Sequence, residues 1–212
     1  MRKFGEFFAN TISFILNPLL MPFYSIAALF SYTSFGQIYL NQILRFLLPV
    51  LLFSTLIPGL FIIVLKRLKI VSDSSLPLHS DRILPYLMVC FANGVLLYHF
   101  YTANMYIWFI GVLAVPVIVS FIGLVINFFW RISAHMLAVG ALIGTIMSVC
   151  YNIKGLNPFV LFIILFILAG CLAVSRLYLN KCNAAQVYAG FFVGLISSFL
   201  IIWINIYMNY QT

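Results

Sequence analysis

The sequence predicts an all-α protein, a polytopic bundle of about six or seven transmembrane helices. Of its 212 residues, 65% are hydrophobic and only 7% are charged, and the mean hydropathy is +1.18. Soluble domains carry about 25% charged residues, so this composition excludes one. Apolar runs long enough to cross a hydrocarbon core about 30 Å thick recur along the chain. Residues 1–212 are therefore expected to form a single integral membrane domain.

Seven apolar segments are expected to be the spans: 11–32, 46–65, 83–101, 106–129, 132–151, 158–175 and 185–207. The first follows two basic residues but precedes no cleavage site and hydrophilic domain, so it is expected to be a retained helix. The uncharged run that begins at Ile83 is about twice too long for one crossing, and a turn is expected near Tyr101. Prolines in the first two spans, Pro18, Pro22, Pro49 and Pro58, are expected to kink or break them.

Counting the spans brings three distant polar clusters to one membrane face. Two spans separate Arg82 from Arg131, and two more separate His135 from Arg176. The N-terminus is expected on the same face and the C-terminus on the other. The positive-inside rule would make this face cytoplasmic, but the alternative is that Arg82, Arg131 and Arg176 serve a site rather than topology. Sidedness is left open.

The charge balance indicates an anionic partner. Eleven Lys and Arg residues stand against three acidic residues, for a net charge of +8. In so apolar a chain, this favours anionic membrane lipids or a lipid phosphate over nucleic acid. Three of the four cysteines lie in apolar runs and are read as small hydrophobes. No metal-ligand spacing is present, so neither a metal nor another cofactor is expected.

The segment 175–190, SRLYLNKCNAAQVYAG, carries the most specific pattern. It resembles the third signature, S-R-x5-H-x3-D, of the type-2 phosphatidic acid phosphatase (PAP2) superfamily. The resemblance implies that Arg176 binds phosphate, but Cys182 stands in place of the nucleophilic histidine and Gln186 in place of its aspartate partner. Gly190 and Gly194 follow at GxxxG spacing, which is interpreted as helix packing.

Two further segments resemble the other PAP2 signatures. Residues 132–135, ISAH, are similar to P-S-G-H, which implies that Ser133 and the Ala134 N–H bind phosphate and that His135 protonates the leaving group. Arg82 and Pro85 resemble the end of K-x6-R-P, which implies a second phosphate-binding arginine, although the lysine is missing. The alternatives are a helix-capping histidine at position 135 and an interfacial anchor at position 82.

Together the motifs, within residues 79–194, resemble degenerate PAP2 proteins of Bacteroidetes-type bacteria. This implies a multi-pass protein of the bacterial inner membrane that hydrolyses a phosphate mono- or diphosphate ester of a lipid without metal. Phosphatidate, an isoprenyl diphosphate and a glycolipid phosphate are the candidate substrates. The identity of the lipid and the oligomeric state stay open.

Whether the site turns over depends on Cys182. Its thiolate can attack phosphorus, and Cys182 and His135 are then the catalytic pair. Alternatively the site binds an anionic lipid headgroup without turnover, or Cys182 is a plain interfacial cysteine. His79 is a further candidate for the missing nucleophile. A transporter or structural subunit is a third class of function, but the spans lack the buried carboxylates that ion-coupled carriers use.

Overall fold

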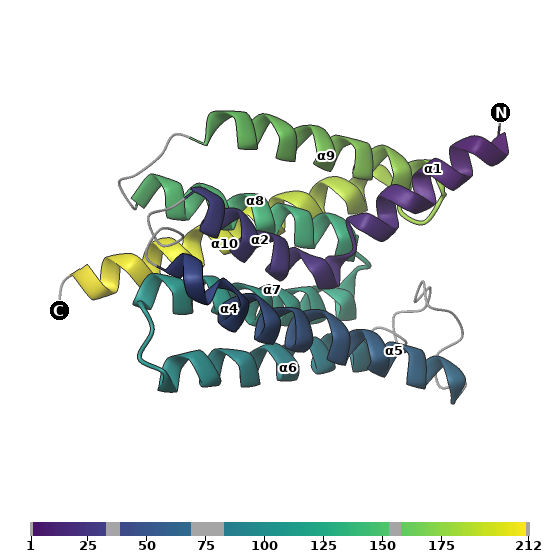
Figure 1. Cartoon of the computed structure of the whole chain (residues 1–212). Coiled ribbons are helices and arrows are strands. Elements are labelled where there is room, and N and C mark those ends of the chain that lie inside the picture. Colours follow the sequence, from purple (N-terminus) through teal and green to yellow (C-terminus); the bar gives the residue numbers. More distant parts are fainter. Residues whose placement is uncertain (1, 33–38, 69–82, 153–157, 211–212) are drawn as a thin grey trace.

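The computed structural model describes residues 2–32, 39–68, 83–152 and 158–210, and within these ranges every regular element is a helix, with short turns between them. The helices, shown in Figure 1, are α1 (Arg2–Ile15), α2 (Met21–Tyr32), α4 (Ile43–Leu51), α5 (Ile57–Arg67), α6 (Ile83–Thr102), α7 (Ile107–Phe129), α8 (Ala134–Asn152), α9 (Phe159–Tyr178) and α10 (Ala184–Tyr210). A 3-10 turn (Pro18–Leu20) joins α1 to α2, and a π-helical turn (Leu52–Leu56) joins α4 to α5. A second 3-10 turn (Leu40–Gln42) precedes α4.

Seven helical segments in the described ranges are long and apolar enough to cross a membrane. They are Phe4–Tyr32, Ile43–Arg67, Ile83–Thr102, Ile107–Phe129, Ala134–Asn152, Phe159–Tyr178 and Ala184–Met208. Each coincides with one of the predicted spans to within three residues at either end, except that the first span begins at Phe4, seven residues before the predicted start. The predicted class, an all-α bundle of multiple apolar spans, is therefore confirmed.

The prolines act as expected in the first two spans. The first span breaks at Asn17, whose side-chain Oδ1 accepts a hydrogen bond of 3.0 Å from the Leu19 N–H, and Pro18 opens the 3-10 turn that follows. In the second span Pro49, which has no N–H to donate, lies just before the π-helical turn, and Pro58 lies just after it. Both spans are consequently built from two helical pieces.

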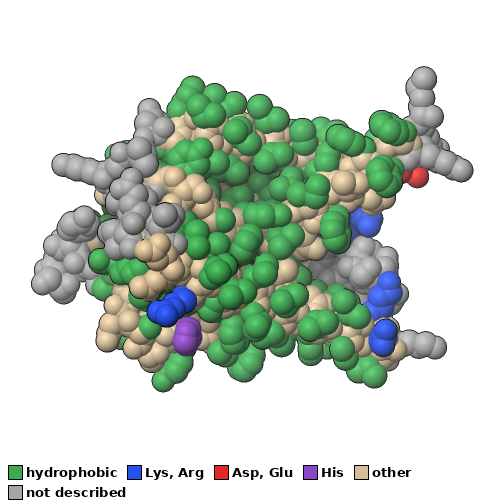
Figure 2. Space-filling view, viewed as in Figure 1, with side chains coloured by type: hydrophobic (Ala, Val, Ile, Leu, Met, Phe, Trp, Pro, Cys, Tyr) green, Lys and Arg blue, Asp and Glu red, His purple; other side chains and the backbone are tan. Residues whose placement is uncertain are grey.

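The helices alternate in direction, so the α7–α8 and α9–α10 connections lie at one end of the bundle (Figure 1). We call this the site end. The N-terminus and the first turn of α6 lie there too, and the C-terminus lies at the opposite end, as the span count predicted. Figure 2 shows hydrophobic side chains over the flank between the two ends, with Lys and Arg side chains confined to the ends.

Helix α8 is the most buried of the seven spans, with 67% of its apolar stretch inside the protein, and α10 packs closely along it. Glycines on both helices allow the backbones to touch. A Cβ on Gly140 would overlap the Phe191 carbonyl oxygen, and a Cβ on Gly194 would overlap that of Leu137. The packing role predicted for Gly190 and Gly194 is confirmed.

Candidate functional site

A cavity of about 760 Å³ lies at the site end, between the first span, α5, α6, α7, α8 and the α9–α10 connection. Most of its lining is apolar. Its charged or titratable lining includes His135, Arg176, Lys181 and Cys182. Further polar lining residues are Asn10, Ser13, Asn17, Ser25, Ser54, Thr55, Tyr86, Asn93, Ser120 and Thr145. Segments distant in sequence thus meet around one space, as predicted from the span count.

Arg176 is the principal cation of this cavity. It lies in the last turn of α9, its side chain is only 7% exposed, and its Nε has no hydrogen-bond partner among the described residues. Glu6 is the one acidic residue in the described ranges, and it does not line the cavity. A guanidinium keeps its charge, and burying it without an anion costs several kcal/mol. Its environment therefore favours an anionic ligand.

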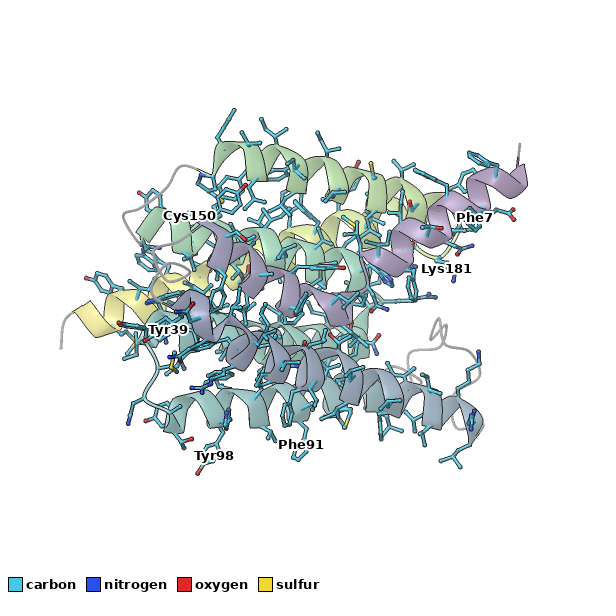
Figure 3. All side chains as sticks on the ribbon, in the orientation of Figure 1. Phe7, Tyr39, Phe91, Tyr98, Cys150 and Lys181 are labelled. Atoms are coloured by element: carbon cyan, nitrogen blue, oxygen red, sulfur yellow. The ribbon has the colours of Figure 1, made fainter. Side chains whose placement is uncertain are left out.

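The end of α9 explains how Lys181 and Cys182 reach the cavity. Asn180 adopts a left-handed conformation, with φ of 51°. Its N–H donates to the Leu177 carbonyl (3.0 Å), and the Lys181 N–H donates to the Arg176 carbonyl (3.2 Å). This pair of bonds is the Schellman motif, which ends a helix and reverses the chain. Lys181 and Cys182 consequently turn back beside Arg176, and Figure 3 shows Lys181 at this junction, near α1.

Gln186 has a structural role at the start of α10. Its Oε1 accepts a hydrogen bond of 3.1 Å from the N–H of Asn183, the residue that precedes the helix. A glutamine at the third helical position that reaches back to this N–H is half of a capping box. Gln186 does not line the cavity. Gln186, at the position of the aspartate in the PAP2 signature, therefore caps the N-terminus of α10.

Two hydrogen bonds join the α7–α8 connection to the α9–α10 connection. The Ser133 N–H donates to the Gln186 carbonyl (3.2 Å), and Nη2 of Arg131 donates to the Lys181 carbonyl (3.2 Å). Arg131, which lies outside the segment that resembles P-S-G-H, thus holds the loop that carries Lys181 and Cys182. These bonds bring the start of α8 to the start of α10.

The start of α8 adds a second feature suited to an anion. Ala134 and His135 are its first residues, and both line the cavity. The first N–H groups of a helix lack partners within it and carry partial positive charge, so they favour a negative group. The Ser133 hydroxyl, which precedes the helix, is 1% exposed and has no hydrogen-bond partner among the described residues.

The structure brings together four of the predicted site residues and separates one from the cavity. Ala134, His135, Arg176 and Cys182 all line the cavity, and Cys182 is 8% exposed. Ser133 is buried beside them but is not part of the lining. Arg82 and His79 lie outside the described residues. Pro85, in the first turn of α6, does line the cavity.

Sequence reasoning missed the polar residues within the spans that line the cavity. Asn93, Ser54 and Thr145 are the most buried of them, at 0%, 1% and 1% exposure. An asparagine inside an apolar run was a usable signal, because polar side chains are costly in a membrane unless they have a partner. Which of these residues point inward depends on the packing of the helices.

Comparison of the chain with protein-family models, with curated proteins and with solved structures found no match. The site must therefore be interpreted from its own residues. Within the described ranges no three His, Cys, Asp or Glu side chains are grouped so as to hold a metal ion. The arrangement comprises a buried cation, a helix N-terminus, an imidazole and a thiol around one cavity. These groups can bind a phosphate and can transfer both a proton and a phosphoryl group.

Proposed function

We propose that this protein is an integral membrane phosphatase of the PAP2 type that hydrolyses the phosphate ester of a lipid. The supporting observation is the buried Nε of Arg176, which has no partner among the described residues, at the polar end of a cavity inside a bundle of apolar spans. Lys181 and the N-terminus of α8 line the same space. Three sources of positive potential in a low-dielectric site favour the doubly charged phosphate group over a neutral ligand.

The cavity also fits the apolar part of such a substrate. Phe14 of α1 and Ile63 of α5 both line it, yet their side chains are 77% and 55% exposed on the outer surface of the bundle. The cavity therefore reaches the lipid-facing side between the first two spans. In this proposal a membrane lipid enters there, with its phosphate at Arg176 and its chain in the apolar body. Phosphatidate, an isoprenyl diphosphate and a glycolipid phosphate all meet these requirements.

The proposed chemistry uses Cys182 and His135. The Cys182 thiolate attacks phosphorus, the bond from phosphorus to the lipid oxygen breaks, and protonated His135 gives its proton to that oxygen. Neutral His135 then takes a proton from the water that attacks the phosphocysteine. The P–S bond breaks, phosphate leaves and the thiolate is restored. Arg176 and the Ala134 N–H bind the non-bridging oxygens, and the roles of Arg82 and Ser133 remain those implied by the resemblance.

The test is release of inorganic phosphate from phosphatidate or farnesyl diphosphate by the purified protein in lipid nanodiscs. Arg176→Gln should lower the rate by at least about 100-fold, because a buried charge-assisted contact is lost. The matched control is Arg67→Gln, an exposed cation at the site end, which should leave the rate unchanged. Arg176→Lys retains the charge and should give an intermediate rate. Full activity in folded Arg176→Gln would refute the assignment.

A second candidate is a non-catalytic protein that binds an anionic lipid headgroup. The observation that favours it is the hydrogen bond between Gln186 and the Asn183 N–H, which leaves Cys182 without the orienting partner that the PAP2 signature provides. This candidate predicts lipid phosphate binding without phosphate release. The double change Cys182→His with Gln186→Asp should then produce turnover. Hydrolysis by the unmodified protein at about 1 s⁻¹ or faster, a typical enzyme rate, would exclude it.

A further inference from the structure

The cavity opens toward the lipid between the first two spans. At the deep end of this opening the two spans are joined, because the Thr55 hydroxyl donates to the Leu19 carbonyl (2.9 Å). A Cβ on Gly59, one turn farther along the second span, would meet only a Leu19 side-chain carbon, at 3.9 Å. From there α1 and α5 diverge toward the site end (Figure 1). The opening therefore widens toward the membrane surface at that end.

One face of α5 borders this opening, and Lys66 continues the same face. Gly59, Ile62 and Ile63 line the cavity, and Ile63 is 55% exposed. Residues three, four and seven apart share a face of an α-helix. Lys66 is three residues after Ile63, four after Ile62 and seven after Gly59. It therefore lies over the opening, about one turn nearer to the end of the helix than the residues that line the cavity.

The neighbouring cation, Arg67, lies to the side of this face. Both residues are exposed in the last turn of α5. At ~100° per residue, Lys66 is rotated about 20° from Gly59 around the helix axis, whereas Arg67 is rotated about 80°. Two exposed cations thus lie at nearly the same depth, and only Lys66 is aligned with the opening. An effect of surface charge alone should be equal at the two positions.

Positive charge continues from Lys66 into the cavity. Lys181 is half-buried and Arg176 is 7% exposed, and both line the cavity. Cations placed along a path attract an anion toward its inner end and raise the rate of association. The three cations become more buried toward the site. They therefore favour the movement of an anionic headgroup from the membrane surface to Arg176.

The surroundings of the opening match an anionic lipid. Phe14 of α1, which is 77% exposed, and Ile63 of α5 border the opening with apolar side chains. Lys66 adds a cation at the end of the span, where the headgroups of a bilayer lie. Cations beside the ends of membrane helices attract anionic lipids. A phospholipid has the same order of groups, with apolar chains below a charged phosphate, so the opening suits a lipid rather than a free phosphate ion.

We propose that Lys66 is the entry cation of the cavity, which attracts the phosphate of an anionic membrane lipid to the opening between α1 and α5 before that phosphate reaches Arg176. This rests on the proposed function for the phosphate end and adds the route and the first contact of the substrate. Because Lys66 acts during entry, it should govern how fast the lipid binds. Arg176, which holds the bound phosphate, should govern how fast the lipid leaves.

The test measures both rates within one nanodisc. Phosphatidate with a pyrene-labelled chain is released by photolysis of a precursor whose phosphate is blocked, and energy transfer from the tryptophans of the protein reports binding. Lys66→Gln should slow association about fivefold, the effect of one cation beside an anionic lipid. Lys66→Arg should keep the rate of the unchanged protein. Arg67→Gln should change the rate by less than about twofold, because Arg67 lies to the side of the opening.

Salt separates attraction from a structural effect of the substitution. At about 1 M salt the Debye length falls to about 3 Å, so the difference in association rate between Lys66→Gln and the unchanged protein should disappear. A difference that persists at this salt concentration would overturn the role of Lys66. Normal association in Lys66→Gln, or equal slowing in Arg67→Gln, would overturn it too.

Gly59 tests the route of entry. Gly59→Phe places a ring in the opening and should slow association at least as much as Lys66→Gln. Gly94→Phe is the matched control, because a Cβ on Gly94 would meet nothing within 4 Å and Gly94 does not line the cavity. Unchanged association in folded Gly59→Phe would show that the lipid enters elsewhere, and the proposal for Lys66 would then be wrong.

Arg176→Gln distinguishes failure of the entry cation from failure of the phosphate site. It should raise the dissociation rate of phosphatidate at least about tenfold, because a buried charge-assisted bond is lost. Slow association in Lys66→Gln with unchanged dissociation in Arg176→Gln would support the entry cation and refute the phosphate site. Fast dissociation in Arg176→Gln with normal association in Lys66→Gln would support the phosphate site and refute the entry cation.

Discussion

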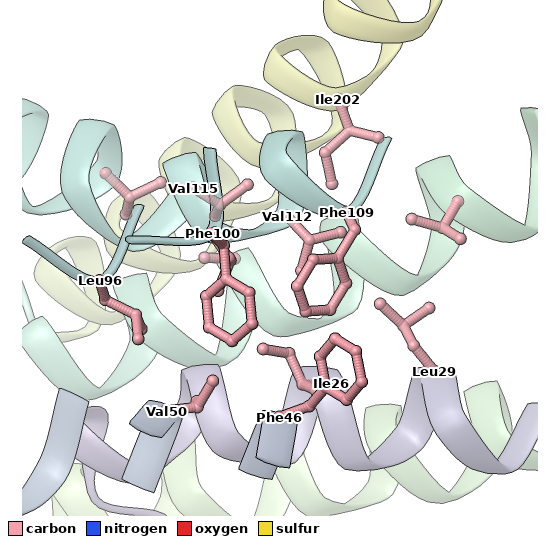
Figure 4. Packing of buried hydrophobic residues seen from close by; sticks show 14 of the residues in the cluster. Ile26, Leu29, Phe46, Val50, Leu96, Phe100, Phe109, Val112, Val115 and Ile202 are labelled. Carbon is pink, nitrogen blue, oxygen red and sulfur yellow. The ribbon is translucent and has the colours of Figure 1, made fainter. Parts of the chain in front are cut away.

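The two ends of the bundle are built differently. At the end opposite the site, the rings of Phe46, Phe100 and Phe109 pack together at centroid distances of 5.4 to 5.8 Å, and Phe109 is 1% exposed (Figure 4). At the site end the same spans enclose a cavity of about 760 Å³. Protein interiors are normally filled to crystal-like density, so such a space is unusual. The packed rings at the aromatic end therefore stabilise the bundle, whereas the cavity at the site end leaves room for a ligand.

The largest expected effect is at the α8–α10 contact, which both ends share. Gly194→Val should destabilise the protein by about 3 kcal/mol or more, because its Cβ would overlap the Leu137 carbonyl and neither helix backbone can yield. Thermal unfolding in detergent measures the effect. Gly170→Val on α9, where a Cβ would meet nothing within 4 Å, is the control and should be neutral. Equal stability of the two variants would contradict the close contact.

The next effect separates the two ends. Phe109→Ala should cost about 3 kcal/mol, because it leaves a cavity among rings that support one another. Its affinity for lipid phosphate at temperatures where it is folded should match that of the unchanged protein. Phe91→Ala is the control, since Phe91 is 69% exposed and points outward in Figure 3. A large loss of lipid affinity in folded Phe109→Ala would show that the two ends are coupled.

The features predicted from sequence are those that depend on composition along the chain. Hydropathy located the seven spans, because a helix must be apolar along its length to cross a bilayer. The span count then placed His135 and Arg176 at one end. The proline pattern located the two spans built from separate pieces. None of these predictions required knowledge of which face of a helix points inward.

The features that were missed depend on side-chain direction and local geometry. Asn93 of α6 and Thr145 of α8 line the same cavity only because each helix turns that face inward. The role of Gln186 was visible in part, since Asn183 and Gln186 have the spacing of a capping box. The resemblance to the PAP2 signature instead led to the interpretation of Gln186 as a replacement for the aspartate. The site role of Arg82, which lies outside the described residues, stays a prediction.

A smaller effect is expected at Arg131, which positions the site loop without lining the cavity. Arg131→Gln should lower affinity for phosphatidate about fivefold, because the Lys181 carbonyl loses its 3.2 Å hydrogen bond and the loop with Cys182 is less well held. The melting temperature should change little. Binding titrations in nanodiscs measure the affinity, with Arg67→Gln as the matched loss of a cation at the same end. A fall in stability without a change in affinity would assign Arg131 to the fold alone.

The smallest effect is expected at Gln186, where the cap and the PAP2 signature make opposite predictions. If Gln186 caps α10, Gln186→Ala should cost about 0.5 to 1 kcal/mol and leave lipid phosphate affinity unchanged, because only the bond to the Asn183 N–H is lost. Gln186→Glu should retain the stability, since glutamate forms the same capping box and its charge suits a helix N-terminus. Thermal unfolding and phosphatidate binding on the same samples separate the two roles. Unchanged stability with lost affinity in Gln186→Ala would place this side chain in the binding site. The binding site would then extend from the cavity lining into the first turn of α10.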